Sequence, residues 1–313
     1  MNIAFFGTSE FVGSVQHARF LRRLIAAGVL PAVVVTAPDA PAGPGVLAVK
    51  SAALEFGIPV LQPAALGGLA QELAKREIEL SLVAAYGKIL PPEVLAVPKF
   101  GSLNVHPSLL PRWRGPTPIQ AAILAGDSVT GATIIQMDAE MDHGPIIAKR
   151  EFPLGELVWT APALSDALTD LGVELFLEIL KPWTLGKIIP EPQHHETATY
   201  SRILKKEDGH ISWSLPAREI ERMTRALQPW PGAYTFWRRG GEDVRLKIEM
   251  ATVLPAPSKA EPHGTVIQRG DALAVTTGQG LLGIERLRPA GGHSIPGPDF
   301  LRGHSAIIAA VLQ

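Results

Sequence analysis

In the first half of the chain, short apolar runs are separated by segments in which apolar residues recur at helical spacing. This pattern predicts strands separated by helices. Short runs rich in β-branched and aromatic residues at 3–6 and 31–36 have no polar side, which is typical of strands buried on both faces of a parallel sheet. Between these runs, apolar residues recur at helical spacing on one face, and the pattern stops at Gly28. Residues 1–36 therefore predict a strand–helix–strand unit.

The same alternation continues to residue 180. The pattern predicts further helices over 50–56, 66–76, 118–125 and 163–180, and further strands over 58–61, 80–84, 102–106, 131–137 and 145–150, the last at an edge. This order is typical of a Rossmann-like α/β domain with a parallel sheet. Gly7 and Gly13 are six residues apart, and neither G-x-G-x-x-G nor a Walker pattern occurs, so the sequence carries no nucleotide fingerprint.

The pattern changes after the last of these helices. Residues 182–200 lack periodicity and are rich in Pro and His, which is typical of a linker. Beyond them, a helix is predicted near 217–227, and short strand-like runs separated by Gly and Pro follow at 245–249, 264–267, 272–276 and 281–287. We therefore predict an α/β domain over 1–189, a linker over 190–204 and a small OB-like β-barrel domain over 205–313.

The composition is typical of a folded protein without disulfides or membrane helices. The chain has 313 residues, of which 46% are hydrophobic, and its formal net charge is −1. Residues 1–204 carry 15 Lys and Arg against 19 Asp and Glu, whereas residues 205–313 carry 14 against 11, so the positive excess lies in the C-terminal part. Without cysteine, a signal-peptide pattern or an apolar run as long as a membrane helix, the chain is expected to be cytoplasmic with no membrane partner.

The stretch from residue 102 to 115 carries the candidate chemistry. Asn104 and His106 alternate with apolar residues in the predicted strand, so their side chains project on the same side. Asp142 follows the strand predicted at 131–137, and we expect it at the same edge of the parallel sheet, where such folds bind ligands. The three polar groups are therefore predicted to meet at one site.

These residue types favour acyl transfer. An amide N–H can hold the oxyanion that forms when a carbonyl carbon is attacked, an imidazole can donate or move a proton, and a carboxylate can accept one from an attacking amine. No Ser or Cys nucleophile accompanies them, and the G-x-S-x-G elbow is absent. Direct transfer between two bound substrates is therefore favoured over a covalent acyl-enzyme.

The motifs around these residues resemble those of the 10-formyltetrahydrofolate-dependent formyltransferases. The resemblance rests on Asn104-x-His106, on Ser108-Leu109-Leu110-Pro111-x-x-Arg114-Gly115, on Thr130-Gly131, and on Met137-Asp138 with Asp142-x-Gly144. The segments Pro111-Arg112-Trp113-Arg114-Gly115, Pro118-Ile119-Gln120, Lys205-Lys206-Glu207-Asp208-Gly209 and Pro229-Trp230-Pro231 resemble the branch that acts on methionyl-tRNA. The resemblance keeps motif order nearly end to end.

This resemblance implies a formyl donor, a partner and a set of site residues. The donor would be 10-formyltetrahydrofolate and the acceptor initiator Met-tRNA, handled by a monomer without a metal. Asn104, His106 and Asp142 fall on the catalytic trio. The folate-contacting positions would be Tyr86, Gly87, Ile89, Leu90, Ser108, Leu109, Leu110 and Pro111, and contacts to tRNA would come from Arg114, Lys205, Lys206, Arg238 and Arg239.

The sequence also departs from the family, which keeps two alternatives open. Residues 38–47, usually basic in the family and used for the tRNA acceptor end, contain no Lys or Arg; Pro107 and His143 stand where many members have glycine and threonine. The alternatives are a folate-dependent N-formyltransferase that acts on an amino sugar nucleotide, and a binding protein for folate or tRNA without turnover. The predicted barrel argues against the first and the intact trio against the second.

Some polar and aromatic residues favour a structural interpretation. His194 and His195 are adjacent, without metal-ligand spacing, and are predicted to be solvated linker residues. Four aromatic residues near the start of the barrel are predicted to belong to its core: Trp230, Tyr234, Phe236 and Trp237.

Overall fold

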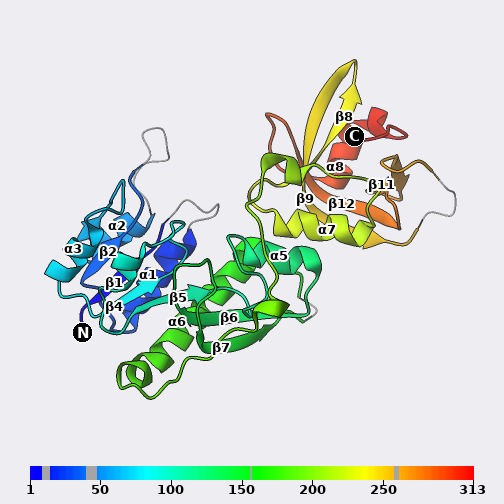
Figure 1. The fold of residues 1–313 in the computed structure, drawn as a ribbon. Helices are drawn as coiled ribbons and strands as arrows, with labels where there is room; N and C mark the ends of the chain where they lie inside the picture. The colour runs from blue at the N-terminus through cyan, green and yellow to red at the C-terminus, as the bar shows by residue number, and fades with distance from the viewer. Residues whose placement is uncertain (9–14, 40–47, 156, 257–260) are drawn as a thin grey trace. The chain divides into compact units, whose positions relative to one another are not determined.

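The computed structural model of the protein describes residues 1–8, 15–39, 48–155, 157–256 and 261–313. The chain divides into two compact units (Figure 1). The first contains Met1–Ala122, Asp127–Leu157 and Pro162–Arg202, and the second contains Ile123–Gly126, Val158–Ala161 and Ile203–Gln313. Residues 190–202, assigned to a linker from the sequence, thus group with the first unit.

The first unit is built on a seven-stranded sheet in the order β3-β2-β1-β4-β5-β6-β7. Its strands are β1 (Ile3–Phe6), β2 (Val33–Val35), β3 (Val60–Leu61), β4 (Leu80–Val83), β5 (Ser102–His106), β6 (Val129–Gln136) and β7 (Ile146–Pro153). Strands β1 to β5 pair in parallel, which confirms the Rossmann-like prediction. The last two differ from the prediction, because β6 runs antiparallel to β5 and β7 antiparallel to β6.

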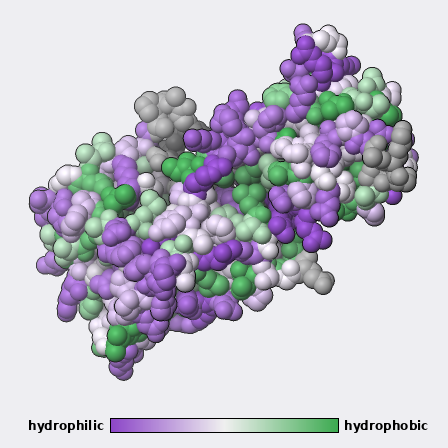
Figure 2. Space-filling view, turned by 45° about the vertical axis from the view of Figure 1, so that its right-hand side comes forward, coloured by the Kyte–Doolittle hydropathy of each residue, from purple (hydrophilic) through white to green (hydrophobic). Residues whose placement is uncertain are grey.

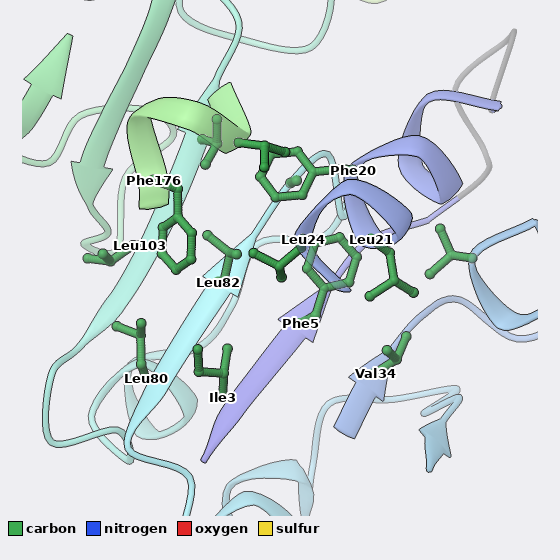
Figure 3. Close-up of a cluster of buried hydrophobic side chains, with 14 of the residues drawn as sticks. Ile3, Phe5, Phe20, Leu21, Leu24, Val34, Leu80, Leu82, Leu103 and Phe176 are labelled. Atoms are coloured by element: carbon green, nitrogen blue, oxygen red, sulfur yellow. The ribbon is translucent and has the colours of Figure 1, made fainter. Parts of the chain in front are cut away.

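Helices cover both faces of this sheet, as the unbroken apolar strands require. The helices are α1 (Val15–Ala26), α2 (Ala48–Glu55), α3 (Leu69–Lys75), α4 (Pro92–Leu95), α5 (Pro118–Ala125) and α6 (Ala161–Thr184). On one face Phe5 and Leu82 pack with Leu24 of α1 and Phe176 of α6 (Figure 3). On the other face Phe6 packs with apolar residues of α3 and α4. Successive residues of β1 thus serve opposite cores.

The second unit is a separate antiparallel sheet with its own core. Its main path is β10 (Val266–Arg269), β11 (Ala272–Thr276), β12 (Leu281–Pro289), β9 (Glu242–Leu254) and β8 (Ala233–Arg239), and β13 (Ile295–Pro296) pairs with β12. Helices α7 (Ala217–Ala226) and α8 (Gly297–Gly303) contribute apolar residues to the core, together with Trp213 and Trp237. The sheet forms a half-barrel, which agrees with the predicted small β-barrel domain at the C-terminal end of the chain.

The aromatic residues of this unit are only partly where the sequence predicted them. Tyr234 and Trp237 are buried, as expected, at 7% and 3% exposure. Trp230 is 41% exposed, so its assignment to the core was wrong. Trp230 belongs to the turn that precedes β8, so it lies outside the strand that carries Tyr234 and Trp237.

The outer surface mixes polar and apolar side chains. On the face seen in Figure 2, hydrophilic and apolar residues are interspersed. No described helix is long and apolar enough to cross a membrane.

Candidate active site

Strand β5 supplies two of the three candidate catalytic side chains. Leu103 and Val105 point into the hydrophobic core, where they are 0% and 8% exposed. Asn104 and His106, which alternate with them, therefore project to the other face, as the sequence predicted. The core thus fixes the positions of two polar side chains that point away from it.

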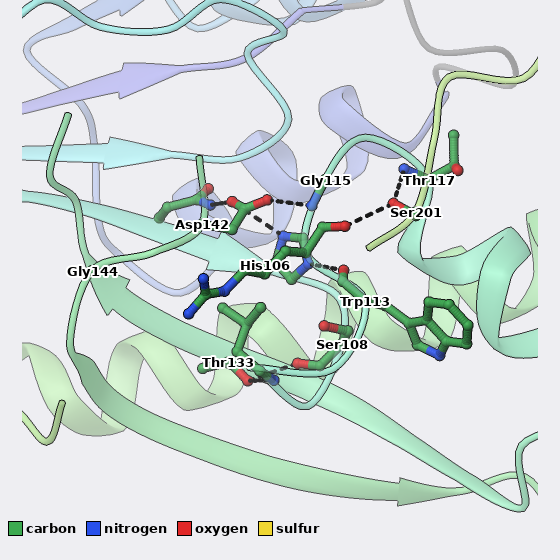
Figure 4. A network of polar contacts seen from close by, with 12 residues as sticks. His106, Ser108, Trp113, Gly115, Thr117, Thr133, Asp142, Gly144 and Ser201 are labelled. Atoms are coloured by element: carbon green, nitrogen blue, oxygen red, sulfur yellow. Dashed lines mark hydrogen bonds and ion pairs between the residues drawn. The ribbon is translucent and has the colours of Figure 1, made fainter. Parts of the chain in front are cut away.

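Asp142 completes the site from the connection between β6 and β7. Its Oδ1 accepts a hydrogen bond from Asn104 Nδ2 at 3.2 Å and lies 3.5 Å from His106 Nδ1. Its Oδ2 accepts from the Gly115 N–H at 2.8 Å, so the carboxylate lies between His106 and Gly115 (Figure 4). The side chains of His106 and Asp142 are 5% and 12% exposed. The predicted trio is therefore brought together in a largely buried place.

The path by which Asp142 arrives differs from the prediction. Because β6 is antiparallel to β5, the end of β6 lies beside the start of β5, where Gln136 pairs with Leu103. The connection must return along β5 to bring Asp142 to Asn104 and His106. At Asp142 it takes a left-handed backbone conformation (φ 52°), which costs a non-glycine residue roughly 1–2 kcal/mol. Contacts around Asp142 must offset that cost.

Hydrogen bonds fix the orientation of the His106 ring. Its Nε2 lies 2.9 Å from the carbonyl oxygen of Trp113. A carbonyl only accepts, so Nε2 carries the hydrogen and donates it. Nδ1 is then the ring nitrogen that faces Asp142, and a proton can pass between these two groups.

The loop from Pro107 to Gly115 is held rigidly against β6. Thr133, fully buried, receives the Leu110 N–H at 3.1 Å and donates to the Ser108 carbonyl at 2.6 Å. Ser108 Oγ in turn donates to the Arg112 carbonyl at 2.6 Å. The loop ends at Gly115 (φ 99°), where an added Cβ would lie 2.7 Å from the Ser201 carbonyl oxygen. Only glycine fits at the point that gives its N–H to Asp142.

The predicted folate-contacting residues divide into exposed and buried groups. Ile89 is 65% exposed, Gly87 is also exposed, and Leu109 and Pro111 are partly exposed. Tyr86, Leu90, Ser108 and Leu110 are buried, the first two in the core around Phe6. A ligand can therefore meet the first group through side chains, but the second only through the backbone. Which of them contacts folate stays a prediction.

Arg114 lies inside the first unit, with 2% exposure. Its Nε and Nη2 donate to Gln193 Oε1 at 3.1 and 2.7 Å, and Nη2 lies 2.8 Å from His195 Nδ1. A guanidinium buried in this way does not suit the predicted contact with tRNA phosphate. The burial of Arg114 could not be predicted from the sequence, because its partner Gln193 is distant along the chain and leaves no local pattern.

Gln193 and His195 lie beside the site although the sequence pattern did not predict them there. Gln193 is 5% exposed, and its Nε2 donates to the carbonyl oxygens of Asp142 at 2.9 Å and Gly144 at 2.7 Å. His194 and His195 are both exposed, as predicted. The His195 ring also stacks on that of His143, with the ring centroids 4.0 Å apart, which the sequence did not predict. Residues 190–202 have no periodicity, so only the folded structure reveals their place beside the site.

The other candidate tRNA contacts lie on the surface of the second unit. Lys205 and Lys206 are exposed at the start of the short 3-10 helix η2 (Lys206–Gly209). Arg238 pairs with Asp243 at 3.0 Å, and Arg239 lies 5.3 Å from the centre of the Trp237 ring. All four residues are exposed, and their contact with tRNA stays a prediction. Most of the non-basic segment 38–47, namely residues 40–47, lies outside the described residues.

The arrangement has the parts needed for transfer of an acyl group to an amine. Asn104 uses one amide hydrogen on Asp142. Its other hydrogen can hold a developing oxyanion, while Asp142 and His106 can accept and pass on a proton. Among the described residues, no group of three His, Cys, Asp or Glu side chains is placed to hold a metal ion.

Comparison with protein families matches nearly the whole chain. The family model for formyl transferase matches residues 1–180, and that for the formyl transferase C-terminal domain matches residues 203–305. The methionyl-tRNA formyltransferase of Roseiflexus sp. (strain RS-1) is 44% identical over 310 residues, covering 97% of this chain and 92% of the relative. That of Chloroflexus aggregans is 46% identical over 303 residues, covering 94% and 96%.

Solved structures share the fold at lower identity. HypX from Aquifex aeolicus, in complex with tetrahydrofolic acid, has a TM-score of 0.65 and 19% identity. The match covers 98% of this chain but 47% of HypX, so this chain spans about half the length of that protein. An N-formyltransferase from Helicobacter canadensis, in complex with folinic acid and dTDP-3-aminofucose, has a TM-score of 0.63 and 17% identity, covering 91% of this chain and 98% of that one. At such identities the likeness concerns the fold alone.

Proposed function

Because the chain belongs to the formyl transferase family, we propose that it transfers the formyl group of 10-formyltetrahydrofolate to the α-amino group of methionine on initiator Met-tRNA. The observation that carries the proposal is the contact of Asn104, His106 and Asp142, which places an amide N–H donor beside a proton acceptor in a largely buried place. The identity to relatives named methionyl-tRNA formyltransferase over nearly their whole length supports the tRNA substrate.

In the proposed reaction, the neutral amine attacks the formyl carbon directly. An α-amino group has a pKa of about 7.7–8.0, so a useful neutral fraction exists near neutral pH. The new carbon–nitrogen bond pushes the carbonyl electrons onto the formyl oxygen, and the free amide hydrogen of Asn104 stabilises that oxyanion. Asn104 is held in place by its bond to Asp142, so it needs no reorganisation during the step.

The amine must lose a proton, and the folate nitrogen must gain one. Asp142 accepts the proton of the attacking nitrogen as the bond forms, and His106 Nδ1, 3.5 Å away, can share it. When the oxyanion collapses, the bond from the formyl carbon to the folate nitrogen breaks, and that nitrogen takes up the proton that Asp142 and His106 received from the amine. The products are the formylated amine and tetrahydrofolate, and the protons balance without any metal.

Residues of both units offer contacts to the two proposed substrates. The exposed Ile89 and the partly exposed Leu109 offer apolar contacts to a pterin ring, and loop backbone groups offer hydrogen bonds. Lys205, Lys206, Arg238 and Arg239 offer phosphate contacts on the second unit. The proposed substrate implies a cytoplasmic protein, because translation takes place there, and we retain the expectation of a monomer.

One feature favours a second candidate, an N-formyltransferase for an amino sugar nucleotide. Residues 38–47 contain no Lys or Arg, although phosphate contacts supply much of the affinity for a nucleic acid. That reaction would use the same trio on a different amine. The positive balance of residues 205–313 favours the tRNA substrate instead.

Direct assay separates these candidates. The purified protein is incubated with 10-formyltetrahydrofolate and either Met-tRNA or a panel of amino sugar nucleotides, and the formylated product is identified by mass. Formylation of Met-tRNA alone is expected. Formylation of a sugar nucleotide alone would establish the second candidate, and donor binding without transfer to any acceptor would point to a binding protein.

A further inference from the structure

We propose that Gln193 is a positioning residue for the reaction, which orients Asp142 and is itself held by the buried Arg114. This inference rests on the proposed function, since it takes Asp142 as the group that accepts the proton. Gln193 lies in a segment that shows no motif, and its side chain bonds to Asp142, Gly144 and Arg114 rather than to Asn104 or His106 within the described part of the chain. Its effect on the chemistry would therefore pass through Asp142.

The Gln193 side chain is fully used. Nε2 donates to the carbonyl oxygens of Asp142 and Gly144, on the two sides of His143, at 2.9 and 2.7 Å. Oε1 accepts two hydrogen bonds from Arg114, at 3.1 and 2.7 Å. Arginine only donates and a carbonyl only accepts, so the partners fix which end of the amide carries the oxygen. The amide thus cannot turn over without breaking hydrogen bonds at both ends.

Asp142 needs such a constraint at its backbone. It stands in a left-handed conformation, φ 52°, which aspartate tolerates better than most residues but which still costs free energy relative to the right-handed region. A Cβ at Gly144 would overlap the Gln136 carbonyl oxygen, so the backbone is also pressed closely against β6. Asn104 and Gly115 fix the Asp142 carboxylate, and Gln193 fixes the peptide group that carries it.

Arg114 in turn is anchored to the segment that carries Gln193. Its N–H donates to the Thr199 carbonyl at 2.9 Å, and its own carbonyl accepts from the Ser201 N–H at 2.7 Å. Its Nη2 also donates to His195 Nδ1, which must then lack a hydrogen. Arg114 directly precedes Gly115, whose N–H donates to Asp142. The buried Arg114 side chain also binds the Gln193 amide, which holds the Asp142 backbone.

Two substitutions at one position test this role. Gln193→Glu keeps an oxygen for Arg114, with which it gains an ion pair, but it replaces the donor to the two carbonyls by an acceptor. Gln193→Met is similar in length and removes both sets of hydrogen bonds. We expect either change to lower kcat by about 10- to 100-fold, as small misplacements of catalytic groups do. KM for the folate donor should change by less than about 3-fold, because uniform binding is untouched.

The matched control is Glu196→Gln, three residues further along the same segment, where the side chain is 72% exposed and pairs with His194. It should leave kcat unchanged. Thermal unfolding separates positioning from folding, since both Gln193 variants should lose kcat at a temperature well below the one at which they unfold. A kcat within about 3-fold of the unmodified protein in both Gln193 variants would overturn the inference.

A readout without activity keeps this test distinct from the test of the proposed function. Amide hydrogen exchange of the peptide over 137–145 should speed up in Gln193→Met and stay unchanged in Glu196→Gln. Unchanged exchange in Gln193→Met would overturn the inference even if the protein formylates Met-tRNA. Failure of the unmodified protein on Met-tRNA would remove the proposed function, and the exchange result would still decide whether Gln193 holds the Asp142 loop.

Discussion

Asn104 has two amide hydrogens, one of which is bound by Asp142 Oδ1 at 3.2 Å. If the other stabilises the oxyanion, Asn104→Ala should lower kcat by about two orders of magnitude or more, since loss of one such donor costs about 2.7–4 kcal/mol in the transition state. KM for the folate donor should change by less than about 3-fold. Steady-state kinetics with both substrates varied measures this.

Asp142→Asn should cause a loss of at least similar size for a different reason. The amide keeps the shape of the carboxylate but cannot accept the proton of the attacking amine, and general base catalysis contributes about 10²–10⁴-fold. Single-turnover kinetics should show a slow chemical step with normal donor binding. Retention of kcat within a few-fold in either variant would remove the assigned role.

Gly115 allows a prediction with an internal control, because Gly28 shares its left-handed conformation. At Gly28 (φ 85°) an added Cβ meets nothing within 4 Å, whereas at Gly115 (φ 99°) it lies 2.7 Å from the Ser201 carbonyl oxygen. Both Gly→Ala changes pay the conformational cost of about 1–2 kcal/mol. Only Gly115→Ala should also displace the N–H donor of Asp142 and lower kcat. Equal kcat in the two variants would contradict this view of the loop.

At this scale the sequence predicted that Asn104, His106 and Asp142 meet, but it did not predict the residues that support them. Asn104 and His106 follow from strand alternation, whereas Asp142 was expected beside them at the edge of a parallel sheet, although β6 is antiparallel to β5. Gln193 and the burial of Arg114 did not follow, because hydrogen bonds between residues 79 positions apart leave no local pattern. Buried polar groups acquire their roles from tertiary partners, which a single sequence does not specify.

At the scale of elements, ion pairs between α1 and α6 offer a test of stability against pH. Asp170 of α6 contacts Arg19 and Arg23 of α1. The hydrogen bond from Arg19, aided by both charges, holds the pKa of Asp170 below its usual value of 3.8. A lowered carboxyl pKa stabilises the fold above the unfolded pKa, and the contribution is lost as the pH falls through the folded one.

Asp170→Asn should therefore destabilise the first unit at pH 7 by about 0.5–1 kcal/mol, a value kept small because the partners are partly exposed. The difference from the unmodified protein should shrink below pH ~4. The matched control is Asp166→Asn, since Asp166 lies 3.9 Å from Arg19 and is 46% exposed. Urea unfolding across this pH range measures the effect, and a difference that stays constant with pH would exclude the ion pair as its cause.

The elements themselves were predicted with errors in direction and in ends. Apolar runs reveal a buried strand but not its orientation, so β6 and β7 were expected to be parallel and are not. Helix α6 continues to Thr184, beyond the predicted end at 180, and carries Pro182 inside it. Its partly buried Trp183 and Leu180 pack against the core, so tertiary contacts carry the helix past a residue that usually stops one.

At the scale of the whole molecule, each unit has its own core, but the chain's positive excess is confined to residues 205–313. That distribution, together with the absence of basic residues in 38–47, places more of the expected phosphate binding on the second unit. Each phosphate neutralised by Lys or Arg steepens the fall of log affinity with log salt by about 0.9 on duplex nucleic acid. The slope of log affinity against log salt therefore reports the number of phosphate contacts, which an affinity at one salt concentration does not.

The double variant Lys205→Ala/Lys206→Ala should weaken Met-tRNA binding and reduce this slope by about 0.9 for each phosphate that is no longer neutralised. The control is Lys181→Ala/Lys187→Ala, which removes the same charge from exposed lysines of the first unit. Fluorescence anisotropy over a range of salt concentrations gives both slopes. If the control changes the slope as much as the Lys205/Lys206 pair does, general attraction rather than local contact accounts for binding. If neither changes the slope, Met-tRNA is bound without phosphate contacts from Lys205 and Lys206, and the predicted contacts are wrong.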